Sequence, residues 1–354
     1  MKRIGNLYDK ICQEDNIRLA IRNASKGKRH RRQVRRVLEQ EDRAVEQIVS
    51  ILCSGSYTPR TARKKIIRDG AAGKEREITI PAFYPDQIIQ WAVMQVLEPV
   101  FMKGMYRYCC GSVPGRGGLA AKRYVERALK KKKSRYILKL DVRKFYPSVS
   151  HAKLKQLLAK KIKDKQLLDL LGAIIDHGGL GLPIGFYSSQ WFANFYLQEV
   201  DHYIKQELKI PYYVRYVDDM VLMGPNKRKL HRARMALQGY LSSNAYELAV
   251  KDNWQLWRKG TRPLDFVGYR FYTNRIRLRR RLFYRITATV RRIRERGLNI
   301  RRAGRFLSLM GWCKRIPFRR YYVERIRPIL PKWEARRYIS RWELRRAMAR
   351  ARAH

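Results

Sequence analysis

Acidic side chains are scarce in this chain of 354 residues, which has 29 Asp and Glu against 80 Lys and Arg and a formal net charge of +51. Self-repulsion on this scale destabilises a compact fold, so folding itself does not explain the excess. The natural counter-charge is a polyanion, and many phosphate contacts predict strong, salt-sensitive binding of nucleic acid. A disordered basic tail is excluded because 45% of the residues are hydrophobic and 11% are aromatic.

Cysteine and long apolar runs are also scarce. The five cysteines are odd in number and show no Cys-x-x-Cys ligand spacing, which predicts reduced thiols in a cytosolic protein. No stretch approaches the roughly 18 apolar residues of a membrane span, and the N-terminal basic residues precede no apolar segment typical of a signal peptide. We therefore expect a cytoplasmic protein.

The length of the chain exceeds what one core usually supports, so two or three subdomains are expected. Residues 4–53 predict helices that contain a basic run, Lys26–Arg36, which either faces solvent or contacts phosphate. Residues 55–81 predict short strands joined by a bend at Gly70–Gly73. Further helices are predicted over 86–101, 119–133, 153–176, 188–208, 227–244 and from 281 onward, and strands over 135–142, 252–257 and 264–279. Three tryptophans of the last region are predicted to be buried: Trp312, Trp333 and Trp342.

The stretch Tyr216–Asp219 (Tyr-Val-Asp-Asp) places two adjacent carboxylates between two runs typical of β-strands, and so predicts a hairpin. Two acids in one tight bend are unfavourable unless a cation binds there. Carboxylate oxygens suit hard divalent ions such as magnesium, which also hold phosphates. The alternative is an ordinary Asp-Asp turn, since Asp favours turns through local hydrogen bonds.

A third acid, Asp141, ends a predicted strand about 75 residues before the hairpin. The order strand, helices, hairpin, helix, strand can place Asp141 beside Asp218 and Asp219 in one antiparallel sheet backed by helices. Three carboxylates so arranged would clamp two metal ions about 4 Å apart. Such ions can activate an attacking 3′-hydroxyl and stabilise a departing pyrophosphate.

Six segments, in order over roughly residues 60–280, resemble the motifs of reverse transcriptases. They are the fingers segment of bacterial enzymes (Lys74–Pro81), the Pro-Gly-Arg segment (Pro114–Gly118), motif A (Leu140–Ser148), motif B (Gly181–Gln190), motif C (Tyr216–Asp219) and the primer-grip segment (Leu264–Tyr269). The resemblance implies an α+β right-hand polymerase. Its parts would be a basic helical N-terminal extension (1–55), fingers (56–134), a palm with an antiparallel sheet backed by helices (135–280, with a fingers insertion around 151–185) and a helical basic thumb (281–354).

The resemblance also implies roles for individual residues. Asp141, Asp218 and Asp219 would be catalytic, and with the carbonyl of Val142 they would bind two Mg²⁺ ions, for which Mn²⁺ can substitute. The dNTP would contact Lys74, Arg76, Tyr146, Ile184, Gln190 and Lys251. Template or primer would contact Arg116, Gly185, Tyr216, Phe266, Gly268, Arg291 and Arg292.

Several of these residues have a second interpretation. Lys74 and Arg76 would bind triphosphate, or lie on a solvated strand face. Tyr146 would be a steric gate against a ribose 2′-hydroxyl, or a buried aromatic on a sheet. Lys251 lies near the family's motif D lysine, which could donate a proton to pyrophosphate, but the alignment there is loose.

Motif B favours one subfamily. Ile184-Gly185 followed by Ser189-Gln190 resembles diversity-generating retroelement reverse transcriptases, whereas group II intron enzymes generally carry Gln at position 184. Such enzymes copy a template-repeat RNA with errors at adenines. A Gln could hydrogen-bond near the incoming nucleotide and Ile184 only packs, so discrimination would loosen. Plain core packing of Ile184 is the alternative.

The subfamily implies a set of partners: a structured template RNA, the RNA/DNA duplex, dNTPs and a small basic helical accessory variability protein, in a bacterial or phage-infected cell. The alternatives are a retron, group II intron-like or phage-defence reverse transcriptase. No segment resembles an added DNA-binding or nuclease domain, which argues against a self-mobile intron protein. A different class is a catalytically idle RNA-binding chaperone or maturase, against which the three intact acids speak.

Overall fold

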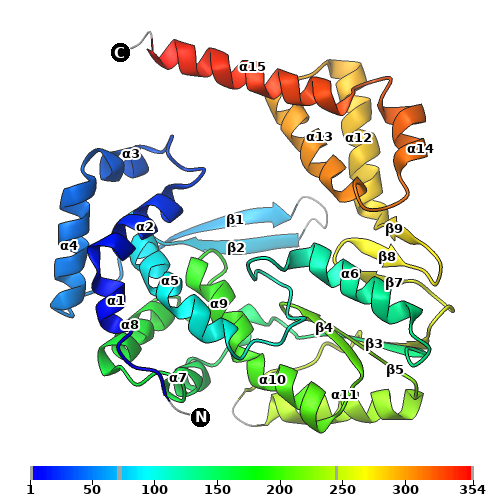
Figure 1. Ribbon diagram of the computed structural model, residues 1–354, viewed down its shortest axis with the longest axis horizontal. Coiled ribbons are helices and arrows are strands. Elements are labelled where there is room, and N and C mark those ends of the chain that lie inside the picture. The colour runs from blue at the N-terminus through cyan, green and yellow to red at the C-terminus, as the bar shows by residue number, and fades with distance from the viewer. Residues whose placement is uncertain (1–2, 70–73, 244–245, 352–354) are drawn as a thin grey trace. The chain divides into compact units, whose positions relative to one another are not determined.

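The computed structural model describes residues 3–69, 74–243 and 246–351, which fall into two compact units, Met1–Arg258 and Lys259–His354 (Figure 1). Among these residues, no helix combines the length and the apolar character that crossing a membrane requires.

Four helices open the first unit: α1 (Tyr8–Cys12), α2 (Glu14–Ser25), α3 (Arg32–Glu39) and α4 (Glu41–Cys53). The apolar residues of α2 recur at helical spacing and are buried where α2 packs against α5: Ile17, Ala20, Ile21 and Ala24. The basic run Lys26–Arg36 begins in the link between α2 and α3 and continues into α3, and most of its side chains are exposed.

The segment after α4 forms an antiparallel pair, β1 (Arg63–Asp69) and β2 (Lys74–Ile80). Arg63 lies opposite Ile80, and Asp69 lies opposite Lys74. This confirms the short strands predicted within 55–81. The predicted bend at Gly70–Gly73 lies outside the described residues.

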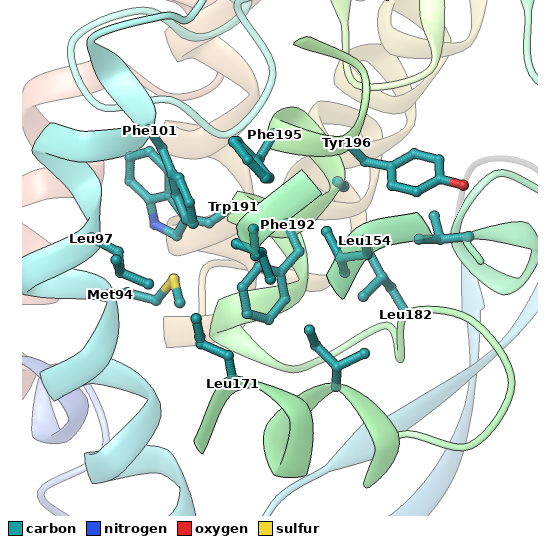
Figure 2. Packing of buried hydrophobic residues seen from close by; sticks show 14 of the residues in the cluster. Met94, Leu97, Phe101, Leu154, Leu171, Leu182, Trp191, Phe192, Phe195 and Tyr196 are labelled. Atoms are coloured by element: carbon teal, nitrogen blue, oxygen red, sulfur yellow. The ribbon is translucent and has the colours of Figure 1, made fainter. Parts of the chain in front are cut away.

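Helices form the centre of the first unit: η1 (Phe83–Gln87), α5 (Ile88–Met102), α6 (Gly117–Lys130), η2 (Tyr146–Ser148), α7 (His151–Ala159), α8 (Lys165–Asp176), α9 (Tyr187–Tyr196), α10 (Gln198–His202) and η3 (Tyr203–Glu207). Figure 2 shows the core in which α5 meets α9, and the rings of Phe101 and Phe195 stack with centroids 4.7 Å apart. Each large apolar side chain fully buried here contributes about 1.5–3 kcal/mol. This packing fixes α9.

A four-stranded antiparallel sheet in the order β4-β5-β3-β6 completes the first unit. Its strands are β3 (Tyr136–Asp141), β4 (Tyr212–Tyr216), β5 (Asp219–Gly224) and β6 (Gln255–Arg258), and α11 (Lys227–Ser242) packs against β3, β5 and β6. Residues 220–224 of β5 are all buried, as expected for a central strand covered on both faces. The predicted strand at 135–142 and the predicted hairpin are confirmed.

The second unit contains a three-stranded antiparallel sheet and helices. The strands are β7 (Leu264–Phe266), β8 (Tyr269–Phe271) and β9 (Ile276–Leu278). The helices are α12 (Arg280–Arg296), α13 (Ile300–Cys313), α14 (Arg319–Tyr321), η4 (Tyr322–Ile326) and α15 (Lys332–Ala351), with α13 packed against α12 and α15.

Four sequence predictions were wrong in detail. Residues 188–208 do not form one helix, because the backbone leaves helical geometry at Leu197 (φ −89°, ψ 8°), between α9 and α10. Residues 153–176 form two helices, because the intervening segment is tied to the N-terminus: Ile162 bridges Ile4, and Asp164 accepts the backbone N–H groups of Asn6, Leu7 and Tyr8. Residues 264–279 form three short strands, because positive φ angles at Val267 and Gly268 turn the chain. The three tryptophans predicted to be buried are 36%, 60% and 37% exposed: Trp312, Trp333 and Trp342.

Candidate active site

The hairpin between β4 and β5 turns in two residues, Val217 and Asp218, because Tyr216 pairs with Asp219. Val217 has a φ of 58°, in the left-handed region that β-branched residues rarely adopt. A hairpin turn with positive φ at its first central residue normally carries Gly there. The backbone at Val217 is therefore strained, and its surroundings must hold it in place.

The buried guanidinium of Arg215 stabilises this turn through a hydrogen bond to the carbonyl of Val217. Arg215 and Asp201 form a fully buried ion pair, with Nε donating to Oδ1 at 2.7 Å and Nη2 donating to Oδ2 at 2.6 Å. Nη1 of Arg215 donates to the carbonyl of Val217 at 2.9 Å and to Oδ1 of Asn194 at 3.1 Å. The strained residue is thus bound to the ends of α9 and α10 through charge-assisted hydrogen bonds.

Close backbone approach completes the support of the turn. The amide of Asn194 donates to the carbonyl of Gly111 at 2.7 Å, and a Cβ on Gly111 would lie 2.5 Å from the backbone nitrogen of Val217. Sequence reasoning missed Gly111, Asn194, Asp201 and Arg215. One sign was available for Arg215: it is a charged residue inside a strand whose neighbours predict burial.

Asp141 is brought beside the hairpin, as predicted, because β3 pairs with β5 and Asp141 lies opposite Asp219. Two lysines face these acids. Nζ of Lys251 pairs with Oδ2 of Asp141, and Nζ of Lys139 lies 3.3 Å from Oδ2 of Asp219. The other oxygen of Asp141, Oδ1, is buried and accepts no hydrogen bond in the described part of the chain.

Burial, followed by the neighbouring charge of Asp141, raises the pKa of Asp218 to about 7, and Lys251 opposes this shift. A carboxyl with a raised pKa is one whose charged form lacks compensation. Asp141 and Asp218 therefore form an electrostatically unsatisfied pair of oxygen donors.

The residues present fit a hard divalent cation, because carboxylate oxygens are the ligands that magnesium prefers. The donors that fit are Asp141, with its unpartnered buried Oδ1, and Asp218. Within the described ranges, no three His, Cys, Asp or Glu side chains converge on one point as a metal cage. Asp219 directs Oδ2 to Lys139, as Asp141 directs Oδ2 to Lys251, and its role as a metal ligand stays a prediction. That the Val142 carbonyl binds metal stays a prediction.

Tyr146 lies close enough to the acids for their charges to affect it. Burial, with smaller contributions from Asp218 and Tyr216, raises the pKa of Tyr146 to about 12. Its carbonyl accepts the N–H of Leu182 at 2.7 Å, which ties η2 to the predicted motif B loop. Motifs A, B and C thus meet at Tyr146.

The motif B loop also contacts the β1–β2 hairpin. The N–H of Thr79 donates to the carbonyl of Ile184 at 2.8 Å. Gly185 has a φ of 126°, and a Cβ there would lie 2.3 Å from the carbonyl oxygen of Thr79. Only glycine allows this approach, which joins Ile184 to β2, the strand that carries Arg76.

Three further residues of the first unit were predicted to contact the dNTP, the template or the primer, and their surroundings differ. Gln190 is exposed on α9. Arg116 donates to the carbonyls of Tyr106 and Cys109, at 2.7 and 3.2 Å, so its guanidinium supports the loop it belongs to. The side chain of Lys74 lies outside the described residues.

The predicted primer-grip residues belong to the second unit. Phe266 is fully buried, and Gly268 follows it in the tight turn between β7 and β8. Gly268 has a φ of 84°, and a Cβ there would lie 2.7 Å from the ring of Trp312. Arg291 and Arg292 are exposed on α12.

The family model for reverse transcriptase (RNA-dependent DNA polymerase) matches residues 63–271, more than half of the chain. The match contains β1 to β8 and all three acids. The chain belongs to the reverse transcriptase family. Reverse transcriptases normally use divalent metal ions, in keeping with the donors found here.

Two curated relatives have bacterial sources. The group II intron-encoded protein LtrA of Lactococcus lactis subsp. cremoris is 27% identical over 172 residues, which are 46% of this reverse transcriptase chain and 28% of LtrA. Protein YkfC of Escherichia coli K12 is 29% identical over 220 residues, which are 58% of this chain and 52% of YkfC. The chain thus spans between about a quarter and a half of these relatives.

The fold is similar to that of a solved telomerase. Telomerase from Candida tropicalis, in complex with a TWJ fragment of telomeric RNA, matches with a TM-score of 0.50 at 14% identity, covering 75% of this chain and 56% of that one. The predicted fold class is confirmed: a mixed helix and strand fold with a reverse transcriptase palm, in which helices back an antiparallel sheet.

Proposed function

We propose that this chain is an RNA-directed DNA polymerase that adds dNTPs to the 3′ end of a primer. The observation that carries the proposal is the pair formed by Asp141, at the end of β3, and Asp218, on the strained β4–β5 turn, with the pKa of Asp218 raised to about 7. Idle acids placed so would only destabilise the fold and repel nucleic acid. Membership of the reverse transcriptase family supports the same activity.

The acids would bind Mg²⁺, with Mn²⁺ as a substitute, and the bound ions would supply charge neutralisation for the triphosphate and the primer hydroxyl. Tyr146 lies near Asp218 and would form the floor under the incoming sugar. Arg76 would bind triphosphate oxygens from β2. Lys251 neutralises Asp141 and, once released from it, would hold a proton near the departing pyrophosphate.

Replacing one acid tests this activity. Asp218→Asn is expected to lower primer extension on an RNA template by at least about 100-fold, in line with the loss of one preorganised charged group. Binding of the RNA/DNA duplex, measured by fluorescence anisotropy, is expected to remain. Asp169→Asn removes an exposed acid of α8, a helix that carries none of the candidate site residues, and serves as the control. If Asp218→Asn leaves synthesis at the wild-type rate, the polymerase assignment fails and an idle RNA-binding chaperone is favoured.

We further propose a diversity-generating retroelement as the biological setting, in the cytoplasm of a bacterial or phage-infected cell. Ile184 supports it, because an aliphatic side chain there offers no hydrogen bond to the incoming nucleotide. The partners would be a structured template RNA and a small basic helical accessory variability protein. Retron, group II intron-like and phage-defence enzymes are the alternatives.

Sequencing of the cDNA separates these settings. Primer extension is run on the RNA encoded beside the gene for this chain, together with the basic protein encoded next to it. The cDNA is expected to carry errors concentrated opposite template adenines. Ile184→Gln is expected to lower that error frequency several-fold. Accurate cDNA from the wild type contradicts the retroelement and leaves the polymerase in place.

We also propose a division of labour along the chain. Residues 1–55 would be a basic extension, 56–134 fingers, 135–280 palm and 281–354 thumb. Exposed Arg291 and Arg292 would follow the duplex backbone without reading sequence, while Phe266 and Gly268 would shape the primer grip. Arg116, Gly185 and Tyr216 would contact template or primer, and Gln190, on α9, would contact the dNTP.

A further inference from the structure

A basic cavity of about 450 Å³ lies in the N-terminal part of the first unit, between α3, α4 and the start of η1. Figure 1 shows α3 and α4 at the end of this unit that lies away from β3, β4 and β5. None of the acids or motif residues of the candidate active site lines the cavity. Its chemistry is therefore available for a separate ligand.

Two helices contribute its charge. Gln33 and Arg36 are three residues apart on α3, and Arg43 and Gln47 are four residues apart on α4, so each pair shares one helix face. Arg60 closes the cavity from the segment before β1. Arg36, Arg43 and Arg60 are exposed and form no ion pair with any described carboxylate. The carboxylate of buried Asp86 lies near Arg60 and offsets part of its charge. Three arginines that line one cavity still favour phosphate, which Arg binds in bidentate fashion.

An aromatic ring stands among these cations. The guanidinium of Arg60 lies 5.8 Å from the centroid of the Tyr84 ring. The phenol of Tyr84 donates to Oε1 of Gln47 at 2.7 Å, which fixes the ring. Buried Asp86 holds the backbone of Arg60 in place, because both of its carboxylate oxygens accept the N–H of Arg60, at 3.2 and 3.3 Å. The half-buried ring is thus oriented by Gln47 and lies among three arginines that line the same cavity.

We propose that this cavity binds a segment of single-stranded nucleic acid. Arg36, Arg43 and Arg60 would hold successive phosphates, and one base would lie against Tyr84, as bases stack on aromatic side chains in other single-strand sites. Glutamine amides at Gln33 and Gln40 offer donors and acceptors for a base edge or a ribose hydroxyl.

Other ligands fit the cavity less well. A duplex hides its bases, so it would use the arginines but neither the concavity nor the ring. An acidic peptide would match the charge and leave the aromatic ring and the amides without a role. The site does not depend on polymerase activity, so Asp218→Asn is expected to leave it intact.

The test uses the full-length protein and a labelled 12-nucleotide single strand of mixed sequence, made as RNA and as DNA, with fluorescence anisotropy across a salt titration. R36Q/R43Q is compared with R32Q/R35Q, which removes the same charge from exposed positions of α3 that do not line the cavity. Loss of two single-strand phosphate contacts is expected to reduce the salt slope by about 1.4 and the affinity about tenfold or more. The control pair is expected to change the slope by less than half as much.

The ring has its own variants. Tyr84→Leu is expected to weaken binding on the order of tenfold through lost stacking. Tyr84→Phe keeps the ring but loses the bond to Gln47, and is expected to weaken binding less. A 4-thiouridine single strand is expected to crosslink to Tyr84 or its neighbours. The RNA arm binding more tightly than the DNA arm assigns a role to the ribose hydroxyl, and equal binding assigns recognition to phosphate and base alone.

Three results would overturn the proposal: equal losses for the two arginine pairs, Tyr84→Leu binding as wild type does while its melting temperature is retained, or a glutamate peptide displacing the strand through the same arginines. Primer extension on a preformed RNA/DNA duplex is measured in parallel. A failure of synthesis in the wild type refutes the polymerase proposal without affecting this one.

Discussion

At the scale of single residues, the site combines favourable chemistry with unfavourable electrostatics. Asp141 and Asp218 are adjacent carboxyls, and the pKa of Asp218 is raised to about 7 by burial and by Asp141. Lys251 and Lys139 pair with Asp141 and Asp219 and so offset part of the repulsion. The metal-free protein therefore carries a local instability that a bound cation would relieve.

The pH dependence of stability tests this instability. In the folded chain the pKa of Asp218 lies above its unfolded value, so between about pH 4 and 7 the folded state binds more protons. The stability that this proton contributes is present at low pH and lost as pH rises through 7. We expect metal-free Asp218→Asn to melt at a higher temperature than wild type at pH 8, with the gap closing toward pH 4.

Thermal unfolding in EDTA, without nucleic acid, measures this gap. Asp169→Asn, an exposed acid on α8, is expected to follow the wild-type curve at every pH. Parallel curves for wild type and Asp218→Asn would show that burial does not raise this pKa.

At the scale of elements, the hairpin turn depends on contacts with α9 and α10. Arg215 and Asp201 are fully buried, and their bonds connect the carbonyl of Val217 to these two helices. A buried ion pair contributes little net stability, but breaking it leaves an uncompensated charge. Its role is to determine the geometry of a turn that Val217 would not adopt alone.

Arg215→Met is expected to lower the free energy of unfolding by about 3–5 kcal/mol, because Asp201 is left buried and unpaired. The double variant R215M/D201L is expected to regain most of that stability in urea titrations. Its primer extension is expected to stay low, since nothing replaces the bond to Val217. Recovery of synthesis together with stability would assign the pair a purely structural role.

The contact between the motif B loop and β2 offers a second test at this scale. Gly185→Ala places a methyl group 2.3 Å from the carbonyl of Thr79, so the loop or the hairpin must move. Gly179→Ala is the matched control: its φ is also positive, at 75°, but a Cβ there meets nothing within 4 Å. Gly179→Ala bears the cost of a left-handed backbone, roughly 1–2 kcal/mol, without a clash, whereas Gly185→Ala adds the contact with Thr79 to its own backbone strain. We expect primer extension to fall at least tenfold in Gly185→Ala alone.

At the scale of the whole molecule, the charge of +51 dominates binding. If six to ten phosphates are contacted, affinity for an RNA/DNA duplex is expected to fall about 10³- to 10⁵-fold between 50 and 200 mM salt. Anisotropy titrations measure this slope, and Asp218→Asn is expected to keep it. A slope near zero would mean that the basic residues serve something other than a polyanion.

Much of the fold and part of the site could be predicted from local pattern. The hairpin of Tyr216–Asp219, the strand that ends at Asp141 and most helices follow from apolar periodicity, which each segment carries by itself. Errors arose where a distant segment determines the local structure. The predicted helix over 153–176 is interrupted because Ile162 forms a β-bridge with Ile4. The exposure of Trp333 could not be read from its type, because burial depends on which neighbour a helix face meets.

The sequence by itself predicted the family and the placement of Asp141 beside the hairpin that carries Asp218 and Asp219, because the order of the strands leaves few arrangements. Only the tertiary structure decided how those acids are held: by Arg215 and Asp201 behind the turn, by Lys251 beside Asp141, and by Gly185 against β2. It also brought Arg36, Arg43, Arg60 and Tyr84 around one cavity. Such contacts join residues far apart in the chain, and the side-chain packing that selects them is absent from any local pattern.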